Sequence, residues 1–169
     1  MFMFTTIEDF KSEWEAESGN TRKILAALTD KSLTQAVVEQ HRTLGRMAWH
    51  IVQSIVEMSG KTGLKVDGPS EHAPVPQSAQ AILSAYDKVT ASFLEQIQSN
   101  WQDDTLAVAD NMYGQDWQRG LTLYIVLKHE MHHRGQMTIL MRQAGLVVPG
   151  IYGPAKEEWT QMSMPEPEI

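Results

Sequence analysis

The stretch that decides the fold is Trp117–Gln143, with the sequence WQRGLTLYIVLKHEMHHRGQMTILMRQ. Its apolar residues recur at the three- and four-residue intervals that are typical of an amphipathic helix. Gly145 is a suitable stop two residues later, because glycine readily adopts the left-handed conformation that ends many helices. We therefore predict a long helix over 117–143, and the histidines inside it are the feature to explain.

Two of these histidines, His129 and His133, are four residues apart and so lie one turn apart on one helix face. The same face continues through Thr122, Val126, Gln136 and Leu140. Because this stripe is apolar at both ends, the pair is expected to point into the protein, where unpartnered imidazoles cost free energy. A divalent cation would satisfy both rings. His132 points about 100° away from His133, so it is expected beside the site or at the surface.

Three more stretches predict helices, at about 6–28, 42–58 and 78–99, with a break expected near Ser18–Asn20 in the first. The polar segment 60–76 exceeds an ordinary helix connection of about 2–8 residues, so the helices that it joins need not be antiparallel. No segment alternates with period 2, and we expect no sheet. The sequence thus predicts an all-α four-helix bundle, one domain over 1–169, with a coil-like tail over 147–169.

The composition narrows the chemistry that this bundle can perform. The chain has 169 residues, a net charge of −7 and no Cys, so any metal must rest on His or carboxylate ligands. An acidic chain argues against nucleic-acid binding, which needs a basic face. No apolar run reaches the roughly 20 residues of a membrane span, and the N-terminal segment lacks a basic start, so a cytoplasmic location is expected.

A third ligand is needed, because catalytic zinc sites use three protein ligands and an open position. His50 is the best candidate, since it lies in the predicted helix 42–58 at the edge of the apolar stripe, although a satisfied core histidine is the alternative. His41 and His72 have polar neighbours and are expected to face solvent. For Glu130 and Arg134, the alternative to a role beside the ligands is a solvated i,i+4 ion pair.

The segment His129–His133 also matches the H-E-x-x-H signature of zinc proteases, with Glu130 as the general base. The third ligand of such an enzyme could be Glu157 or Glu158. No strand is predicted nearby to bind a peptide, so a zinc-dependent hydrolase is the weaker alternative.

The segment His129–Gln136, HEMHHRGQ, resembles the H-x-x-H-H-R-G-Q signature of the DinB/YfiT-like family of metalloenzymes. The likeness extends to Arg42–His50 and to the stretch from Gln143 to Tyr152. The resemblance implies a bundle in up-down-down-up order, a homodimer, and a divalent metal, zinc or nickel, held by three histidines. Carried onto this chain, these ligands are His50, His129 and His133.

The same resemblance implies a transferase or isomerase that uses a low-molecular-weight thiol, such as bacillithiol, mycothiol or glutathione, and of these we expect a thiol S-transferase that acts on small electrophiles. Glu130, His132, Arg134 and Gln136 are then expected to surround the ligands. Since the chain has no Cys, a thiolate at the metal would have to arrive on a cofactor. The alternative is a non-catalytic metal-binding bundle of a stress response.

Overall fold

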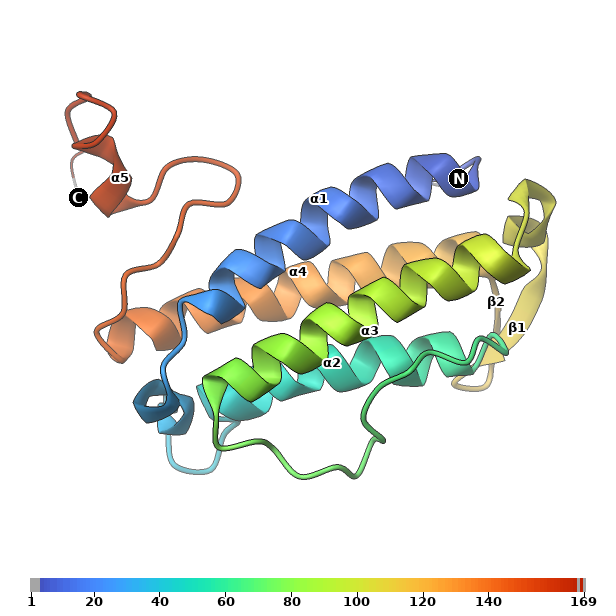
Figure 1. Ribbon diagram of the computed structural model, residues 1–169, viewed down its shortest axis with the longest axis horizontal. Helices are drawn as coiled ribbons and strands as arrows, with labels where there is room; N and C mark the ends of the chain where they lie inside the picture. The colour runs from blue at the N-terminus through green and yellow to red at the C-terminus, as the bar shows by residue number, and fades with distance from the viewer. Residues whose placement is uncertain (1–3, 167, 169) are drawn as a thin grey trace.

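Four long helices dominate the structure, a computed structural model that describes residues 4–166 and residue 168 (Figure 1). They are α1 (Ile7–Ala26), α2 (Leu44–Gly60), α3 (Ala79–Asn100) and α4 (Arg119–Gln143). Thr6, Thr43 and Ser78 cap the first three, each accepting a hydrogen bond from the backbone N–H three residues later. The four predicted helices are confirmed, and their ends lie within two residues of the predicted ones.

The helices form a bundle in up-down-down-up order. Both α1 and α2 pack against α3 and α4. α2 and α3 run in the same direction, because segment 61–78 returns along the side of the bundle between them (Figure 1). Trp49 and Gln53 of α2 hold this segment by donating to the carbonyls of Ala73 and Ser70, at 3.1 and 2.8 Å. The long connection therefore permits two parallel neighbours, as the resemblance implied.

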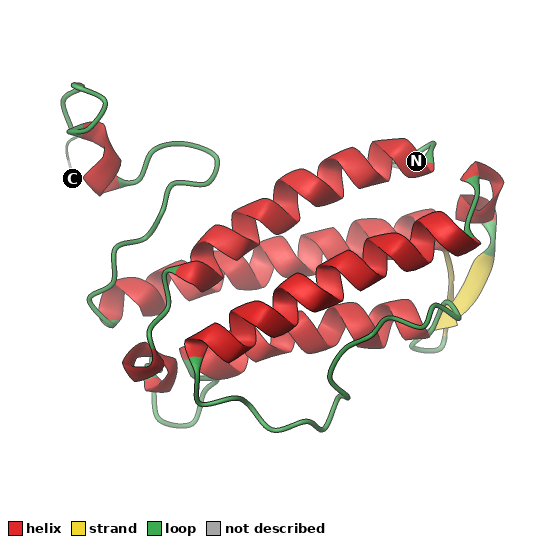
Figure 2. Cartoon of the chain, viewed as in Figure 1, coloured by secondary structure: helices red, strands yellow, loops and turns green. Residues whose placement is uncertain are grey.

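A small hairpin before α4 corrects the expectation that the chain has no sheet (Figure 2). β1 (Ala109–Met112) pairs antiparallel with β2 (Gln115–Gln118). The turn residues Tyr113 and Gly114 have φ of 56° and 84°, and positive φ at both positions is what a type I′ hairpin turn requires. Each strand has four mostly polar residues, too few to show a period-2 pattern. Trp117, which was predicted to begin the helix, lies in β2 instead.

The break expected near Ser18–Asn20 is also wrong, since α1 is continuous through it. Buried residues on both sides, Trp14 and Ile24 among them, fix both halves of the helix to the core. One glycine in a helix costs only about 1 kcal/mol, which this packing outweighs. Two short 3-10 helices lie in the connections, η1 (Asp30–Thr34) and η2 (Asp103–Ala107).

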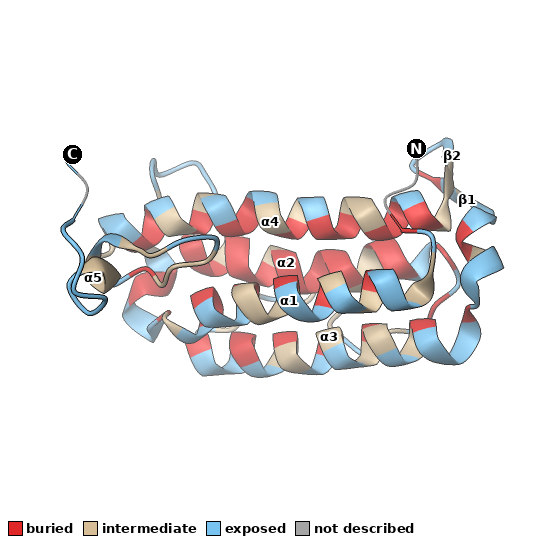
Figure 3. Cartoon of the chain, turned by 90° about the horizontal axis from the view of Figure 1, so that it is seen from above, coloured by how far each residue is buried: buried red, intermediate tan, exposed pale blue. Residues whose placement is uncertain are grey.

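The core runs along the axis of the bundle and includes most of α2 (Figure 3). At one level, the rings of Phe10 and Trp14 meet Phe93 edge-on, with ring centroids 5.9 and 5.0 Å from it. Because α3, α4 and η1 all contact α2, this helix is buried around most of its circumference. A histidine in α2 is therefore held among packed side chains.

The tail after α4 is mostly loop but contains α5 (Lys156–Trp159), a single turn that the coil-like prediction missed (Figure 2). In residues 4–166 and 168, no helix is long and apolar enough to span a membrane.

Candidate metal centre

Three imidazoles meet between α2 and α4. His50 comes from α2, and His129 and His133 come from successive turns of α4. Their ring centroids are separated by 4.9, 4.7 and 4.4 Å, and one nitrogen from each ring lies within 4.8 Å of the other two. His133 is buried and the other two rings are half-buried. The structure thus brings together the three predicted ligands.

The spacing of these rings fits a metal ion. The Nε2 atoms of His129 and His133 are 3.2 Å apart. In a tetrahedral zinc site with metal–nitrogen bonds of about 2.0–2.1 Å, two ligand nitrogens lie about 3.3 Å apart. A cation would satisfy the lone pairs of both nitrogens, and His50 could supply a third ligand from the facing helix. Three protein ligands are the number found in catalytic zinc sites, which keep a further position for water or substrate.

Gln136 sets the tautomer of His133. Its Oε1 lies 2.8 Å from Nδ1 of His133, and its Nε2 lies 3.0 Å from Nε2 of His132. An amide oxygen only accepts, so in this arrangement Nδ1 of His133 donates and its Nε2 carries the lone pair that faces Nε2 of His129 and that a metal would need. His132 is exposed; its ring lies edge-on to that of His133, with the centroids 5.0 Å apart, and also contacts Gln136. These contacts match the supporting position expected for His132 and Gln136.

Burial keeps the imidazoles neutral, which is the form that binds metal. Burial, assisted by the positive charge of Arg42, lowers the pKa of His50 to about 3. Burial and the two neighbouring histidines lower the pKa of His129 to about 4. The pKa of His133 is lowered too, again mainly by burial. The three rings are therefore unprotonated at neutral pH.

Glu130 and Arg134 contact α1 and α3 rather than the histidines. Glu130 accepts a 2.6 Å hydrogen bond from the hydroxyl of Tyr86, and burial raises its pKa to about 7. Arg134 pairs with Glu17 at 2.6 Å, and the hydroxyl of Tyr152 donates to the same carboxylate at 2.8 Å. The alternative of a solvated Glu130–Arg134 pair is wrong, because both side chains are buried. They fix α4, the helix that carries two of the candidate ligands, and make no hydrogen bond to the imidazole rings themselves.

The same contacts disfavour the zinc-protease hypothesis. A general base must reach water at the metal, whereas Glu130 is buried against Tyr86. Of the two candidate third ligands, Glu157 pairs with Arg142, and Glu158 accepts hydrogen bonds from the backbone N–H groups of Gly150 and Ala155.

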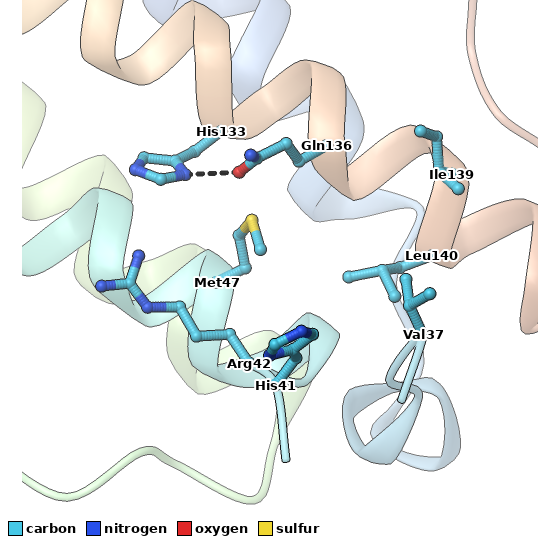
Figure 4. A pocket seen from close by; sticks show the side chains of 8 residues that line it. All are labelled: Val37, His41, Arg42, Met47, His133, Gln136, Ile139 and Leu140. Carbon is cyan, nitrogen blue, oxygen red and sulfur yellow. Dashed lines mark hydrogen bonds between the residues drawn. The ribbon is translucent and has the colours of Figure 1, made fainter. Parts of the chain in front are cut away.

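Two cavities flank the histidines. The apolar cavity, of about 380 Å³, is lined by Val37, His41, Arg42, Met47, His133, Gln136, Ile139 and Leu140 (Figure 4). The polar cavity, of about 300 Å³, is lined by Arg42, Arg46, His50, Gln53, Ser54, Glu57, Glu71 and Tyr113. The first reaches His133 and the second reaches His50, so the histidine cluster is accessible from two chemically different sides.

Arg42 lines both cavities, and the sequence prediction did not include it among the site residues. The four-residue spacing of Arg46 and His50 places Arg46 beside His50, but Arg42 precedes the N-cap Thr43, so no helical spacing could place it at the site. His41 and His72 are exposed as expected, although His41 also borders the apolar cavity.

Comparison with known proteins identifies the family. A sequence profile described as the DinB family matches residues 1–168. The chain belongs to the DinB family. Within this DinB group, the protein named "Uncharacterized protein YrdA" of Bacillus subtilis strain 168 is 46% identical over 167 residues, covering 99% of this chain and 100% of that protein. The resemblance drawn from HEMHHRGQ is thereby confirmed.

Solved DinB-like structures share the bundle. The crystal structure of a DinB-like protein from Bacillus cereus superposes with a TM-score of 0.86 at 46% identity, covering 89% of this chain and 100% of that one. The DinB-like protein YjoA of Bacillus subtilis, at 15% identity, gives a TM-score of 0.66 over 84% of this chain and 96% of its own. The latter likeness concerns the fold alone.

Proposed function

We propose that this protein is a metal-dependent enzyme that transfers a small thiol to an electrophile, with a divalent cation, zinc or nickel, held by His50, His129 and His133. The observation that supports it is the convergence of three neutral imidazoles at a point reached by two cavities. A metal that served stability alone would need no such access.

A cation at this position would lower the pKa of a thiol or water bound to it. The protein's own residues orient the site: Gln136 holds His133 in the metal-binding tautomer, and the cluster around Arg134 fixes α4 against α1. The thiol must come from outside, since the chain has no Cys.

The polar cavity suits a hydrophilic thiol. Arg46 offers positive charge to a carboxylate, and Glu71 offers negative charge to an ammonium group, whereas Glu57 is already paired with Lys61. Thiol cofactors of the glutathione type carry charged groups of this kind, and His50 borders the same space. The thiol sulfur would approach the metal centre from the His50 side.

Elemental analysis tests the metal site. The wild-type chain is expected to bind about one equivalent of zinc or nickel, and His50→Ala, His129→Ala and His133→Ala are expected to lose it. His72→Ala is the matched control, because His72 is exposed and outside the cluster. Full stoichiometry in all three cluster variants would overturn the proposal.

A conjugation assay tests the reaction. Metal-loaded protein is incubated with 1-chloro-2,4-dinitrobenzene and each of glutathione, bacillithiol and mycothiol, and the thioether is quantified. Turnover that disappears in the His129→Ala variant supports the transferase. No turnover with any thiol, despite bound metal, would favour the non-catalytic metal-binding bundle.

A further inference from the structure

The apolar cavity has a charged end and an apolar end (Figure 4). The guanidinium of Arg42 and the ring of His133 lie at one end, and Ile139 and Leu140 lie at the other, with Met47 between them. A ligand that fills this space has to be amphipathic, with a polar head near His133 and an apolar body beyond it.

The charge of Arg42 is unmatched within the part of the chain that the structure describes. The other five arginines each have a polar side-chain partner, namely Asp87 for Arg22, Gln53 for Arg46, Asp110 for Arg119, Glu17 for Arg134 and Glu157 for Arg142. Arg42 is exposed, and among the described residues neither an ion pair nor a hydrogen bond holds its guanidinium, which borders the cavity. A guanidinium without an internal partner can pair with an anionic ligand through two parallel hydrogen bonds.

The opposite end exposes apolar surface. Val37 and Ile139 are each 59% exposed, and Leu140 closes the wall behind them. Covering such side chains stabilises a complex by roughly 25 cal/mol per Å² of apolar surface removed from water. The volume of about 380 Å³ lies within the range of about 300–1,000 Å³ that is typical of small-molecule sites.

We propose that the apolar cavity binds a small monocarboxylate with an apolar body, its carboxylate paired with Arg42 and its body against Met47, Ile139 and Leu140. No Asp or Glu is among the described residues that line this cavity, so a cationic ligand would find no counter-charge there. The proposal is a binding assignment that goes beyond the proposed function, because a carboxylate offers no leaving group to a thiol and the acid is therefore a ligand held beside the histidines. It assigns the thiol to the polar cavity and the apolar acid to the other side of the metal centre.

Calorimetric titration of the zinc-loaded, full-length chain with three eight-carbon probes tests the proposal. Octanoate is expected to bind at least tenfold more tightly than octanol or octylamine, which share its body and lack its charge. Arg42→Met should weaken octanoate binding at least tenfold and leave octanol unchanged. Arg22→Met, which removes the same charge from a distant ion pair, should retain wild-type affinity.

A second variant tests the apolar end. Ile139→Glu places a carboxylate among the apolar side chains and should abolish binding of octanoate and octanol while the zinc content stays at the wild-type value. Ile139 is mostly exposed, so its replacement leaves the core intact.

The outcomes separate this proposal from the proposed function. Bound zinc without octanoate binding, or an Arg42→Met variant with unchanged octanoate affinity, overturns the cavity assignment and leaves the metal centre standing. If the wild-type chain takes up neither zinc nor nickel but still binds octanoate, the cavity assignment stands and the proposed metal-dependent enzyme is overturned. If octanoate does not bind and Ile139→Glu converts a dimer into a monomer in light scattering, the face is an interface between two copies and the assignment is wrong.

Discussion

Replacing Gln136 by Leu tests how the metal centre is oriented. The variant removes the acceptor that lies 2.8 Å from Nδ1 of the buried His133 ring. Without this acceptor, the N–H of Nδ1 can stay unsatisfied, which destabilises the fold by about 1–3 kcal/mol. Alternatively, the proton moves to Nε2 and competes with the metal for that nitrogen. Loss of such a supporting contact typically costs about 10–100-fold in metal affinity, equivalent to about 1.4–2.8 kcal/mol.

Competition against a chromophoric zinc chelator of known affinity at pH 7.5 measures this effect. Gln143→Leu is the matched control, since Gln143 is an exposed glutamine at the end of the same helix. Gln136→Glu keeps an acceptor at the same position and should retain at least wild-type affinity. The reasoning is refuted if Gln136→Leu binds zinc as tightly as the wild type, or if Gln143→Leu weakens binding to the same extent.

Three further perturbations have defined outcomes. Arg134→Met leaves the buried Glu17 carboxylate without its cation and should lower the free energy of unfolding in urea by about 3–5 kcal/mol. A loss below about 1 kcal/mol would show that the Glu17 carboxylate is solvated. Gly68→Ala places a Cβ 2.5 and 2.6 Å from valine methyl groups of α3 and α2 and should cost about 1–3 kcal/mol in the same assay. Gly19→Ala places its Cβ in open space inside α1 and should instead stabilise the protein by up to about 1 kcal/mol. Because burial lowers the pKa of His50 to about 3 from about 6.5, the unfolded chain binds more protons between these values, and the metal-free protein should lose stability as the pH falls through this window. His50→Ala should show a shallower loss between pH 7 and pH 5, and an unchanged slope would contradict this origin.

The helices and the histidine cluster were predictable because local signals determine them. Thr43 and Ser78 are capping residues, and the apolar periodicity that follows each of them defines the buried face. The four-residue spacing of His129 and His133 sets their common face wherever α4 packs.

The positions of Glu130 and Arg134 were less predictable, because α4 is covered on more than one side. It packs against α1 as well as α2, so residues a third of a turn away from the histidines are buried too. A solvated ion pair presumes that only one face of a helix is covered. The cavities were not predictable at all, since the apolar one brings Val37 and Ile139 together from segments far apart in the sequence.

The contact of Arg134 and Tyr152 with Glu17 also bears on how the chain is synthesised. These residues are 117 and 135 positions from their partner, so α1 leaves the ribosome long before the residues that neutralise its buried carboxylate exist. At a synthesis rate of about 5–20 residues per second, roughly 6–23 s separate the synthesis of Glu17 from that of Arg134. During that interval the apolar face of α1 has no finished bundle to cover it. Completion of the fold therefore has to follow the synthesis of Arg134, and nascent chains stalled before Arg134 should remain sensitive to protease.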